Sequence, residues 1–375
     1  MKRIAILVET SLASGRHILT GIASYVRERN DWSIYKQSGH LGAFEPDSIR
    51  NWKGDGIIAR LASKEVLEAV ESLKIPVVDV LGNMENTPHP VVRPDHARIG
   101  EMAAVHFLQK GFRSLAFYGA QYEQWSHMRC EAFLKCGEDV GASCHIKLDS
   151  DRRTRGAAWF RELGEWLKTL QRPTGLLIAS DQYAPEVFEA AHQAGIKIPE
   201  ELSIVGVDND PPFCDLCNPP LSSIDPNHPK VGYEAARLLN EAIETGSMPR
   251  SDVAISPIQI FQRRSSSLNA VNDPALATAM HFISENACSG ISVDEVARAS
   301  GVSRSVLQRK FKSDLNRTVA ESILDEKLRR AQELLRFTNH SITRVAELSG
   351  FNCQEYLNYI FRKHLKTTPR KVRTG

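Results

Sequence analysis

The chain of 375 residues lacks the features that mark a membrane protein or one of the common enzyme classes. No apolar run approaches the roughly 20 residues of a membrane-spanning helix. The N-terminal stretch MKRIAILVE is too short, and too soon followed by polar residues, for a signal peptide, so we expect neither export nor a membrane partner. The motifs G-x-S-x-G, G-x-x-x-x-G-K-[ST], G-x-G-x-x-G and H-E-x-x-H are all absent. Asp208 and Asp210 could supply paired carboxylates, but nothing supplies the rest of an active site, so we expect no enzyme.

Cysteine is sparse and irregularly placed. The seven cysteines are odd in number, which favours a reducing cytoplasm over a disulfide framework. Cys214 and Cys217 form a C-x-x-C without a second pair or a nearby histidine pair, so two loop thiols are favoured over a metal or redox site. We therefore predict a cytoplasmic protein with no metal and no cofactor.

Acidic residues are missing from the last twenty positions, which hold six basic residues. Residues 270–375 contain 17 Lys and Arg against 11 Asp and Glu, whereas the preceding residues contain 30 against 34. The net charge of +2 therefore hides a basic C-terminal part and an acidic remainder. This asymmetry places a polyanionic partner at the C-terminal end.

Apolar, β-rich runs alternate with amphipathic stretches over residues 1–265. The predicted strands are Ile4–Val8, Ile34–Lys36, Gly56–Ala59, Pro76–Val80, Leu115–Tyr118, Gly175–Ala179 and Ser203–Val207, with a further strand ending near Arg93. The predicted helices are 16–29, 63–73, 95–109, 126–140, 155–170, 183–194 and 228–245. Continuous apolar runs are typical of parallel strands covered on both faces, so we predict a doubly wound α/β domain. Its length favours two lobes.

Polar residues directly after the predicted strands are the candidates for ligand binding, because open α/β sheets bind ligands beyond the carboxyl ends of their strands. The candidates are Arg16, Asp95, Trp125, Arg129, Asp208 and Asn209. Asp95 precedes a predicted helix, so helix capping explains it equally well. A solvated helix face or an ion pair is the alternative for Arg129. We expect no helix after Asp208 and Asn209, so capping does not explain them.

Several segments of residues 1–265 resemble, in order, the periplasmic-binding-protein-like sugar domain of LacI/GalR regulators. They are PDHARIGEMAAVHFLQKGFRSLAFYG, WSHMRCEAF, IPEELSIVGVDND and PPLSSIDPNHPKVGYEAARLL. The resemblance implies two lobes, lobe one from about 1–110 plus 226–250 and lobe two from about 111–225 plus 251–265. It also implies that Asp95, Arg129 and Asp208 bind sugar hydroxyls. LacI-type proteins carry their DNA-binding helices before this domain, but here the domain begins near Arg3.

A polar stretch rich in Arg, Ser and Asn, FQRRSSSLNAVND, ends before Pro274 and predicts an interdomain linker over 266–273. Residues 274–375 then form the second domain, with helices over 274–286, 292–300, 303–312, 318–336, 341–349 and 353–364. Two of its segments, 296–312 and 345–363, repeat one pattern: a short helix, a glycine, a polar turn and a second helix with apolar residues four apart. This pattern is typical of a helix-turn-helix, whose second helix enters a DNA major groove.

The ending GFNCQEYLNYIFRKHLKTTPRKVR resembles the signature of the AraC/XylS family of transcription regulators. The resemblance covers about 275–373 and implies the groove-facing, base-contacting positions: Ser305, Gln308, Arg309, Gln354, Glu355 and Tyr359. Glutamine suits adenine, arginine suits guanine and glutamate suits cytosine. The basic residues expected to contact phosphate are Lys310, Lys312, Arg362, Lys363, Lys366, Arg370 and Lys371. A solvated helix face is the alternative for these charges.

The combination of a LacI-like sugar domain and an AraC-type DNA-binding domain resembles the xylose-operon activators. It implies a transcription regulator of sugar catabolism that binds a double-stranded DNA operator and a small sugar, a pentose and xylose first. It also implies a homodimer, and contact with RNA polymerase if the protein is an activator. Two alternatives stay open: a sugar-cleft enzyme with a DNA-binding tail, and a regulator that responds to a different sugar or to none.

Overall fold

The computed structural model describes residues 1–36, 49–82, 87–150, 156–248, 251–268, 273–315, 317–338 and 340–374, with only the backbone at 333, 336, 337 and 374. The chain forms two compact units, Met1–Leu268 and Asn269–Gly375. The division lies inside the range 266–273 predicted as a linker, of which 269–272 fall outside the described residues. No described helix is long and apolar enough to cross a membrane.

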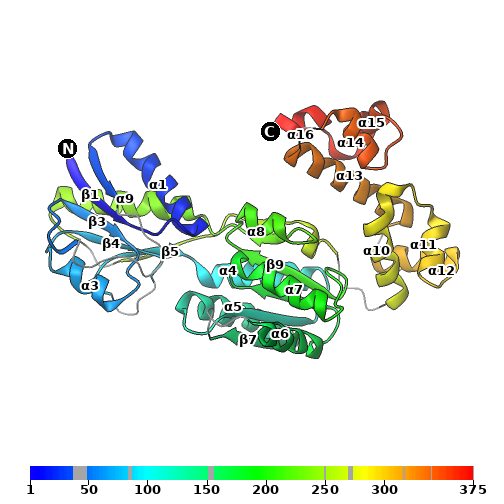
Figure 1. Cartoon of the computed structure of the whole chain (residues 1–375), viewed down its shortest axis with the longest axis horizontal. Helices are drawn as coiled ribbons and strands as arrows, with labels where there is room; N and C mark the ends of the chain where they lie inside the picture. The colour runs from blue at the N-terminus through cyan, green and yellow to red at the C-terminus, as the bar shows by residue number, and fades with distance from the viewer. Residues whose placement is uncertain are drawn as a thin grey trace. The chain divides into compact units, whose positions relative to one another are not determined.

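Lobe one of the N-terminal unit is built on a parallel sheet with the strand order β11-β5-β4-β3-β1-β2 (Figure 1). Its strands are β1 (Lys2–Leu7), β2 (Trp32–Lys36), β3 (Gly56–Ala59), β4 (Val77–Val80), β5 (Val91–Pro94) and β11 (Asp252–Ile255). Helices α1 (Ala13–Arg29) and α9 (His228–Thr245) pack on one face, and α3 (Lys64–Glu71) packs on the other. The central strands β3 and β4 are buried on both faces, as the continuous apolar runs predict.

Two glycines bring α1 and α9 into backbone contact. A Cβ on Gly21 would lie 1.8 Å from the carbonyl oxygen of Pro229, and one on Gly232 would lie 2.0 Å from that of Ile18. No larger residue fits either position unless the helices separate, because the obstructing atoms belong to backbone. The start of α9, where the chain returns from the other lobe, is thereby fixed against the first helix.

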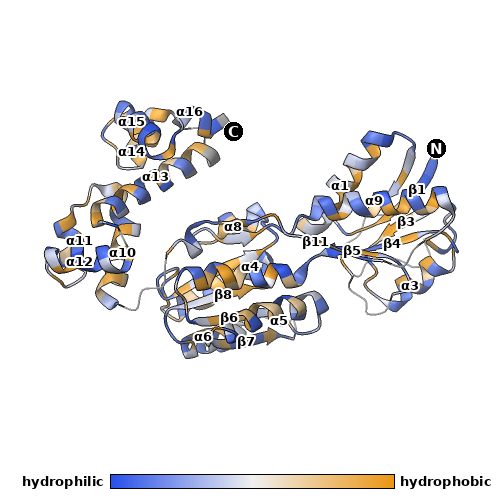
Figure 2. Ribbon diagram, turned by 180° about the vertical axis from the view of Figure 1, so that it is seen from behind, coloured by the Kyte–Doolittle hydropathy of each residue, from blue (hydrophilic) through white to orange (hydrophobic). Residues whose placement is uncertain are grey.

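Lobe two is built on a second sheet with the order β12-β10-β9-β8-β6-β7, in which only β12 is antiparallel to its neighbour. Its strands are β6 (Ser114–Ala120), β7 (Ser143–Asp149), β8 (Thr174–Ile178), β9 (Leu202–Val207), β10 (Ser222–Ile224) and β12 (Ile260–Phe261). Its helices are α4 (His96–Gln109), α5 (Gln124–Glu138), α6 (Ala157–Thr169), α7 (Ala184–Gln193) and α8 (Pro211–Leu216). Figure 2 shows hydrophobic strands covered by helices whose outer faces are hydrophilic. The predicted two-lobed α/β class is confirmed.

The predicted division between the lobes is wrong in two places. Helix α4, predicted in lobe one, packs against α5 in lobe two, and the ring of Phe107 lies where a Cβ on Gly175 would come within 2.5 Å of it. Residues 251–265 were predicted in lobe two, but strand β11 within them is the edge strand of lobe one and pairs parallel with β5. The apolar pattern of an element is the same in either lobe, so the sequence does not show where the chain crosses.

The C-terminal unit consists of helices among its described residues. They are α10 (Pro274–Asn286), α11 (Val293–Ala299), α12 (Arg304–Leu315), α13 (Val319–Phe337), α14 (Ile342–Leu348), α15 (Gln354–Leu365) and α16 (Pro369–Thr374). The pairs α11–α12 and α14–α15 are the two predicted helix-turn-helices, and Gly301 and Gly350 in their turns have φ angles of +69° and +72°. Capping boxes at Ser292 and Thr318 fix the starts of α11 and α13.

The core of this unit follows the repeated pattern. Five apolar residues of the two repeated segments are fully buried: Val296, Leu307, Phe311, Val345 and Phe361. In the second half, Leu328, Ala331 and Leu335 of α13 pack in one cluster with side chains of α14 and α15. The long helix α13, predicted over 318–336, therefore lies between the two motifs in the chain, and these apolar residues are buried against the second.

Candidate functional site

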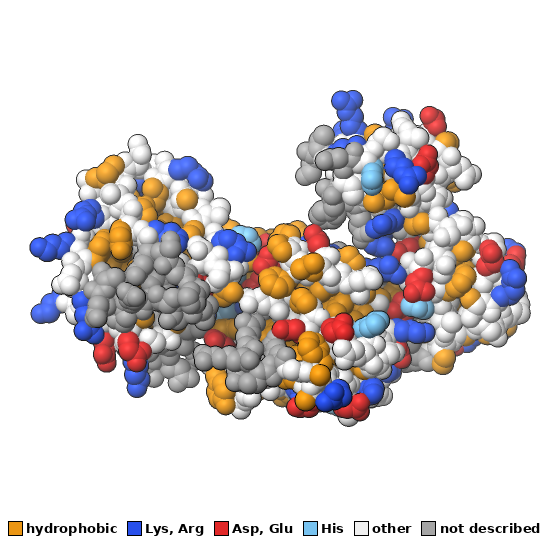
Figure 3. Space-filling view, in the orientation of Figure 1, with side chains coloured by type: hydrophobic (Ala, Val, Ile, Leu, Met, Phe, Trp, Pro, Cys, Tyr) orange, Lys and Arg blue, Asp and Glu red, His pale blue; other side chains and the backbone are white. Residues whose placement is uncertain are grey.

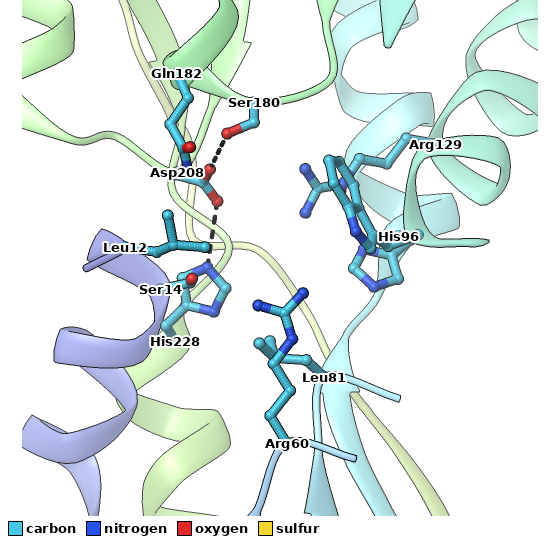
Figure 4. Close-up of a pocket in the computed structure, with 11 residues that line it drawn as sticks. Leu12, Ser14, Arg60, Leu81, His96, Arg129, Ser180, Gln182, Asp208 and His228 are labelled. Carbon is cyan, nitrogen blue, oxygen red and sulfur yellow. Dashed lines mark hydrogen bonds and ion pairs between the residues drawn. The ribbon is translucent and has the colours of Figure 1, made fainter. Parts of the chain in front are cut away.

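A pocket opens in the N-terminal unit where the carboxyl ends of strands from both lobes meet (Figure 4). It encloses about 430 Å³ free of protein atoms, part of it open to solvent. Its lining combines charged, hydrogen-bonding and apolar side chains. These are Leu12, Ser14, Arg60, Leu81, His96, Trp125, Arg129, Ser180, Gln182, Asp208 and His228.

Asp208 is the carboxylate of the lobe-two wall. Its oxygens accept hydrogen bonds from Ser180 Oγ at 2.7 Å and from His228 Nε2 at 3.3 Å (Figure 4). Burial alone would raise the pKa of Asp208, but the His228 hydrogen bond and the positive charge of Arg129 hold that pKa below its ordinary value. Asp208 is therefore a charged acceptor at neutral pH, with its carboxylate in the pocket wall.

Arg129 supplies the positive charge on the same wall. Its side chain comes from α5, is 3% exposed, and lies with its guanidinium carbon 4.8 Å from the ring centroid of Trp125. Nη1 donates to the Ala179 carbonyl and Nε donates to His96 Nδ1 at 3.3 Å. Because His96 Nδ1 accepts, the neutral ring carries its proton on Nε2, which has no partner among the described residues. Burial and then Arg129 hold the pKa of His96 well below its ordinary value.

Arg60 faces this wall from lobe one, directly after β3. Its Nη1 lies 2.5 Å from Glu9 Oε1, and the two side chains are 6% and 1% exposed. Arg60 Nε has no partner in the described structure. Asp79 lies fully buried beside them, accepts from Leu61 N at 3.1 Å, and has its pKa raised by burial to about 7. The buried ion pair fixes the guanidinium at the pocket edge.

The loop after β9 holds Asp208 in an unusual backbone conformation. Asp208 and Asn209 have φ angles of +114° and +46°, which L-residues adopt rarely. The amide of Asn209 donates to Ser223 Oγ at 3.0 Å, and that of Asp210 donates to Asp181 Oδ2 at 2.9 Å. Asp181 is fully buried and lies so close to Gly206 that a Cβ there would be 2.1 Å from Oδ1. Buried polar groups beneath the loop therefore define its shape.

The structure brings together three of the six predicted ligand residues, namely Trp125, Arg129 and Asp208. The other three lie outside the pocket lining and have other partners. Asp95 caps α4 by accepting from Arg98 N at 3.0 Å. Asn209 Oδ1 accepts from Arg263 Nη2 at 2.9 Å, and Arg16 donates to the carbonyls of Thr10 and Ser11.

Contrary to the prediction for Asp208 and Asn209, a helix does follow them: α8 begins at Pro211. The conclusion that Asp208 caps no helix still holds, since its carboxylate binds Ser180 and His228. Arg60, His96 and His228 line the pocket but were not among the predicted ligand residues. Each directly follows a strand or begins the next helix, so the rule of strand ends would have found them if applied to β3, β5 and β10.

The predicted DNA-contacting side chains lie on two helices of the C-terminal unit. Ser305, Gln308 and Arg309 are exposed on α12, and Glu355 and Tyr359 are exposed on α15. Gln354 is half-buried and accepts from Thr343 Oγ1 at 2.9 Å. Each of the two helices thus exposes predicted base-contacting side chains to solvent.

The second helix carries an aromatic pair on its surface. Tyr356 and Tyr359 are 47% and 55% exposed and stack with ring centroids 6.3 Å apart. Lys363 Nζ lies 5.7 Å from the Tyr359 ring centroid. The two tyrosine rings and the ammonium of Lys363 therefore form one exposed group on α15.

Lysine and arginine side chains are exposed on the visible face of this unit (Figure 3). Of the predicted phosphate contacts, six are exposed: Lys312, Arg362, Lys363, Lys366, Arg370 and Lys371. Lys310 differs, because it is half-buried and its ammonium pairs with Asp273, the N-cap of α10. Its first role is therefore structural.

The xylose operon regulatory protein of Escherichia coli (strain K12) is 31% identical to this chain, over 99% of this chain and 96% of that protein. The chain belongs to the xylose operon regulatory protein family. The protein of that name from Haemophilus influenzae is also 31% identical, over 99% of this chain and 98% of its own length. A solved structure of the xylose-binding transcription activator xylR is 28% identical, has a TM-score of 0.83, and is matched over 98% of its length.

Models of smaller units agree with this family membership. A periplasmic binding protein-like domain matches residues 104–266, a XylR N-terminal domain matches 3–93, and a helix-turn-helix domain matches 296–375. The assignment from sequence to AraC/XylS-type regulators with a LacI/GalR-like domain is thereby confirmed. As a member of the xylose operon regulatory protein family, the chain is a DNA-binding transcription regulator with a sugar-binding-type sensor domain, and its relatives are regulators.

Proposed function

We propose that this regulator binds a neutral pentose, xylose first, in the pocket between the lobes, and that binding changes how its C-terminal helices engage an operator. The observation that carries the proposal is the charge balance of the pocket: Arg60 is paired with Glu9, and Arg129 faces Asp208. A balanced set of buried donors and acceptors suits a polyol, whose hydroxyls both donate and accept. The names of the full-length relatives supply the choice of xylose.

Each wall contributes a different part of the recognition. Asp208 accepts from sugar hydroxyls, and Arg129 and Arg60 donate to them. The free Nε2 of His96 donates, and Trp125 packs an apolar ring face. Asp95, Arg16 and Asn209 support the cleft from outside the lining. Because the contacts come from both lobes, a bound sugar favours the arrangement in which the lobes approach each other.

The DNA-binding domain, proposed to extend from 274 to 375, contacts bases through α12 and α15. Gln308 and Arg309 contact one half-site, and Glu355 and Tyr359 contact the next. The exposed basic side chains contact phosphate. We propose a cytoplasmic homodimer that activates transcription through contact with RNA polymerase and catalyses no reaction.

Calorimetric titration of the full-length protein with xylose, arabinose, ribose and glucose tests the ligand. We expect xylose to bind most tightly and to change the affinity for an operator fragment selected by the protein from random DNA. Preferential binding of another sugar would replace the ligand, and turnover of any sugar would support the enzymatic alternative. Light scattering measures the dimer, and a reporter gene behind the selected operator measures activation.

A further inference from the structure

The last described turn of the N-terminal unit is fastened to lobe two by buried serines. Ser265 and Ser266 are fully buried. Ser265 Oγ donates to the Ile204 carbonyl at 2.7 Å and accepts from Ser222 N at 2.8 Å. Ser266 Oγ lies 3.0 Å from His106 Nε2 on α4. The chain therefore leaves the sensor domain from a fixed point on the sheet that carries Asp208.

Arg263 joins this exit segment to the loop of Asp208 and Asn209. Its Nη2 donates to Asn209 Oδ1 at 2.9 Å, and its Nη1 donates to the Leu221 carbonyl at 2.9 Å. Its backbone is fixed by the hydroxyl of Ser222, which accepts from Arg263 N at 2.8 Å and donates to Arg263 O at 3.0 Å. Arg263 itself belongs to the exit segment, and its guanidinium bonds the pocket loop at Asn209 and the chain just before β10 at Leu221.

The pocket end of this connection is the strained part of the loop. Asp208 lines the pocket, and Asn209 follows it with a second positive φ. Residues in such sparsely populated conformations persist only where surrounding contacts hold them, and they concentrate at ligand sites and switches. The bond from Arg263 to the Asn209 side chain is one of those contacts, and it comes from the segment that leads to the DNA-binding domain.

We propose that Arg263 is a positioning residue that couples occupancy of the pocket at Asp208 to the exit segment 263–267, and hence to DNA binding; this rests on the proposed function. Sugar hydroxyls on Asp208 compete with Ser180 and His228 for its oxygens, which changes the forces on a backbone that has little freedom. Asn209 moves with Asp208 because they are adjacent. Arg263 transmits that movement because it bonds Asn209 through its side chain and is continuous along the backbone with the anchored Ser265. Coupling of this kind needs a contiguous set of contacts with two arrangements.

A double-mutant cycle on the full-length protein tests the proposal. The variants are Arg263→Ala, Asn209→Ala and the double variant. Arg98→Ala is the matched control, since the side chain of Arg98 forms an exposed pair with Glu101 on α4. The measured quantity is the ratio of affinities for the selected operator fragment with and without saturating xylose. We expect either single variant to reduce that ratio by about 5-fold or more, and the double variant to reduce it no further.

Two further measurements separate coupling from a structural role. Arg263→Ala should lower that ratio by a larger factor than it lowers the affinity of the DNA-free protein for xylose. Asn209→Asp should restore the wild-type ratio because a carboxylate also accepts from Arg263. Thermal unfolding identifies any variant that fails to fold. If Arg263→Ala does not fold, the test compares the affinity ratios of Asn209→Asp and Asn209→Ala. If wild-type protein shows no effect of xylose on DNA binding, the proposed function fails. If wild type responds and Arg263→Ala and Asn209→Ala respond equally well, the coupling role is overturned.

Discussion

Replacing Asp208 with asparagine separates ligand binding from helix capping when it is compared with Asp95→Ala. Asp208 presents a charged carboxylate to the pocket, and its partners are side chains rather than backbone amides. Asparagine keeps the size and one acceptor oxygen but removes the charge. A hydrogen bond to a charged group contributes about 1.5–3 kcal/mol, so we expect the Kd for xylose to rise about 10- to 150-fold.

Asp95 follows a strand in the same way but serves the backbone. Its carboxylate accepts from Arg98 N, one of the unpaired amides at the start of α4. Asp95→Ala should therefore lower the free energy of unfolding by about 0.5–2 kcal/mol, the usual cost of losing an N-cap. The Kd for xylose should stay within about twofold of wild type, because the pocket lining does not include Asp95.

Calorimetry gives the Kd and urea denaturation gives the free energy of unfolding for both variants. We expect Asp208→Asn to lose affinity for xylose and Asp95→Ala to lose stability. A tenfold loss of xylose affinity in Asp95→Ala would return Asp95 to the binding site and refute the capping assignment. Unchanged affinity in Asp208→Asn would remove Asp208 from it.

Three further results are expected. Gly206→Ala should destabilise the protein by about 1–3 kcal/mol in urea denaturation, because its Cβ would lie 2.1 Å from the carboxylate of a buried aspartate, whereas Gly164→Ala, with its nearest contact at 3.4 Å, should not. Burial raises the pKa of Asp79 to about 7, so wild type loses stability as pH rises from about 4 to 7. The free energy of unfolding of Asp79→Asn should therefore increase relative to wild type by up to about 1.4 kcal/mol per pH unit in this window and stay constant above pH 7. A pH-independent difference would contradict this. Lys312→Ala should reduce the slope of log affinity for DNA against log salt concentration by about 0.9. Lys310→Ala should reduce this slope less, because Lys310 pairs with Asp273. Equal reductions in the two variants would contradict the structural role of Lys310.

The parts of the fold that sequence predicts well are those whose pattern is local and strong. Strands β3, β4, β8 and β9 are buried along their whole length, so their apolar runs have one interpretation. The two helix-turn-helices repeat a glycine and a set of apolar positions, and both are present at the predicted places. Such local patterns identify these strands and helices without knowledge of which distant segments pack against them.

The missed strands have weak patterns for identifiable reasons. Strand β7 is an edge strand with no fully buried residue, so its run SCHIKLD shows no apolar stripe. Strands β10 and β12 have three and two residues, which is too short for any periodicity. Their place in the sheet is decided by partners distant in sequence, β9 and β10, and that information is not local.

The candidate site shows the same limit at the level of single residues. Asp95 and Asp208 both follow a strand, both precede a helix, and both match positions that the family resemblance connects with sugar. What separates them is backbone conformation: Asp95 has φ −75° and accepts from the helix it precedes, whereas Asp208 has φ +114° and faces the pocket. That difference is imposed from below by Ser223 and Asp181, which hold the next two amides. Strand ends therefore indicate where a ligand binds, but the buried residues that shape each loop decide which side chain reaches it. Replacing Asp181 should consequently raise the Kd for xylose as much as replacing Asp208, although Asp181 is not part of the pocket lining.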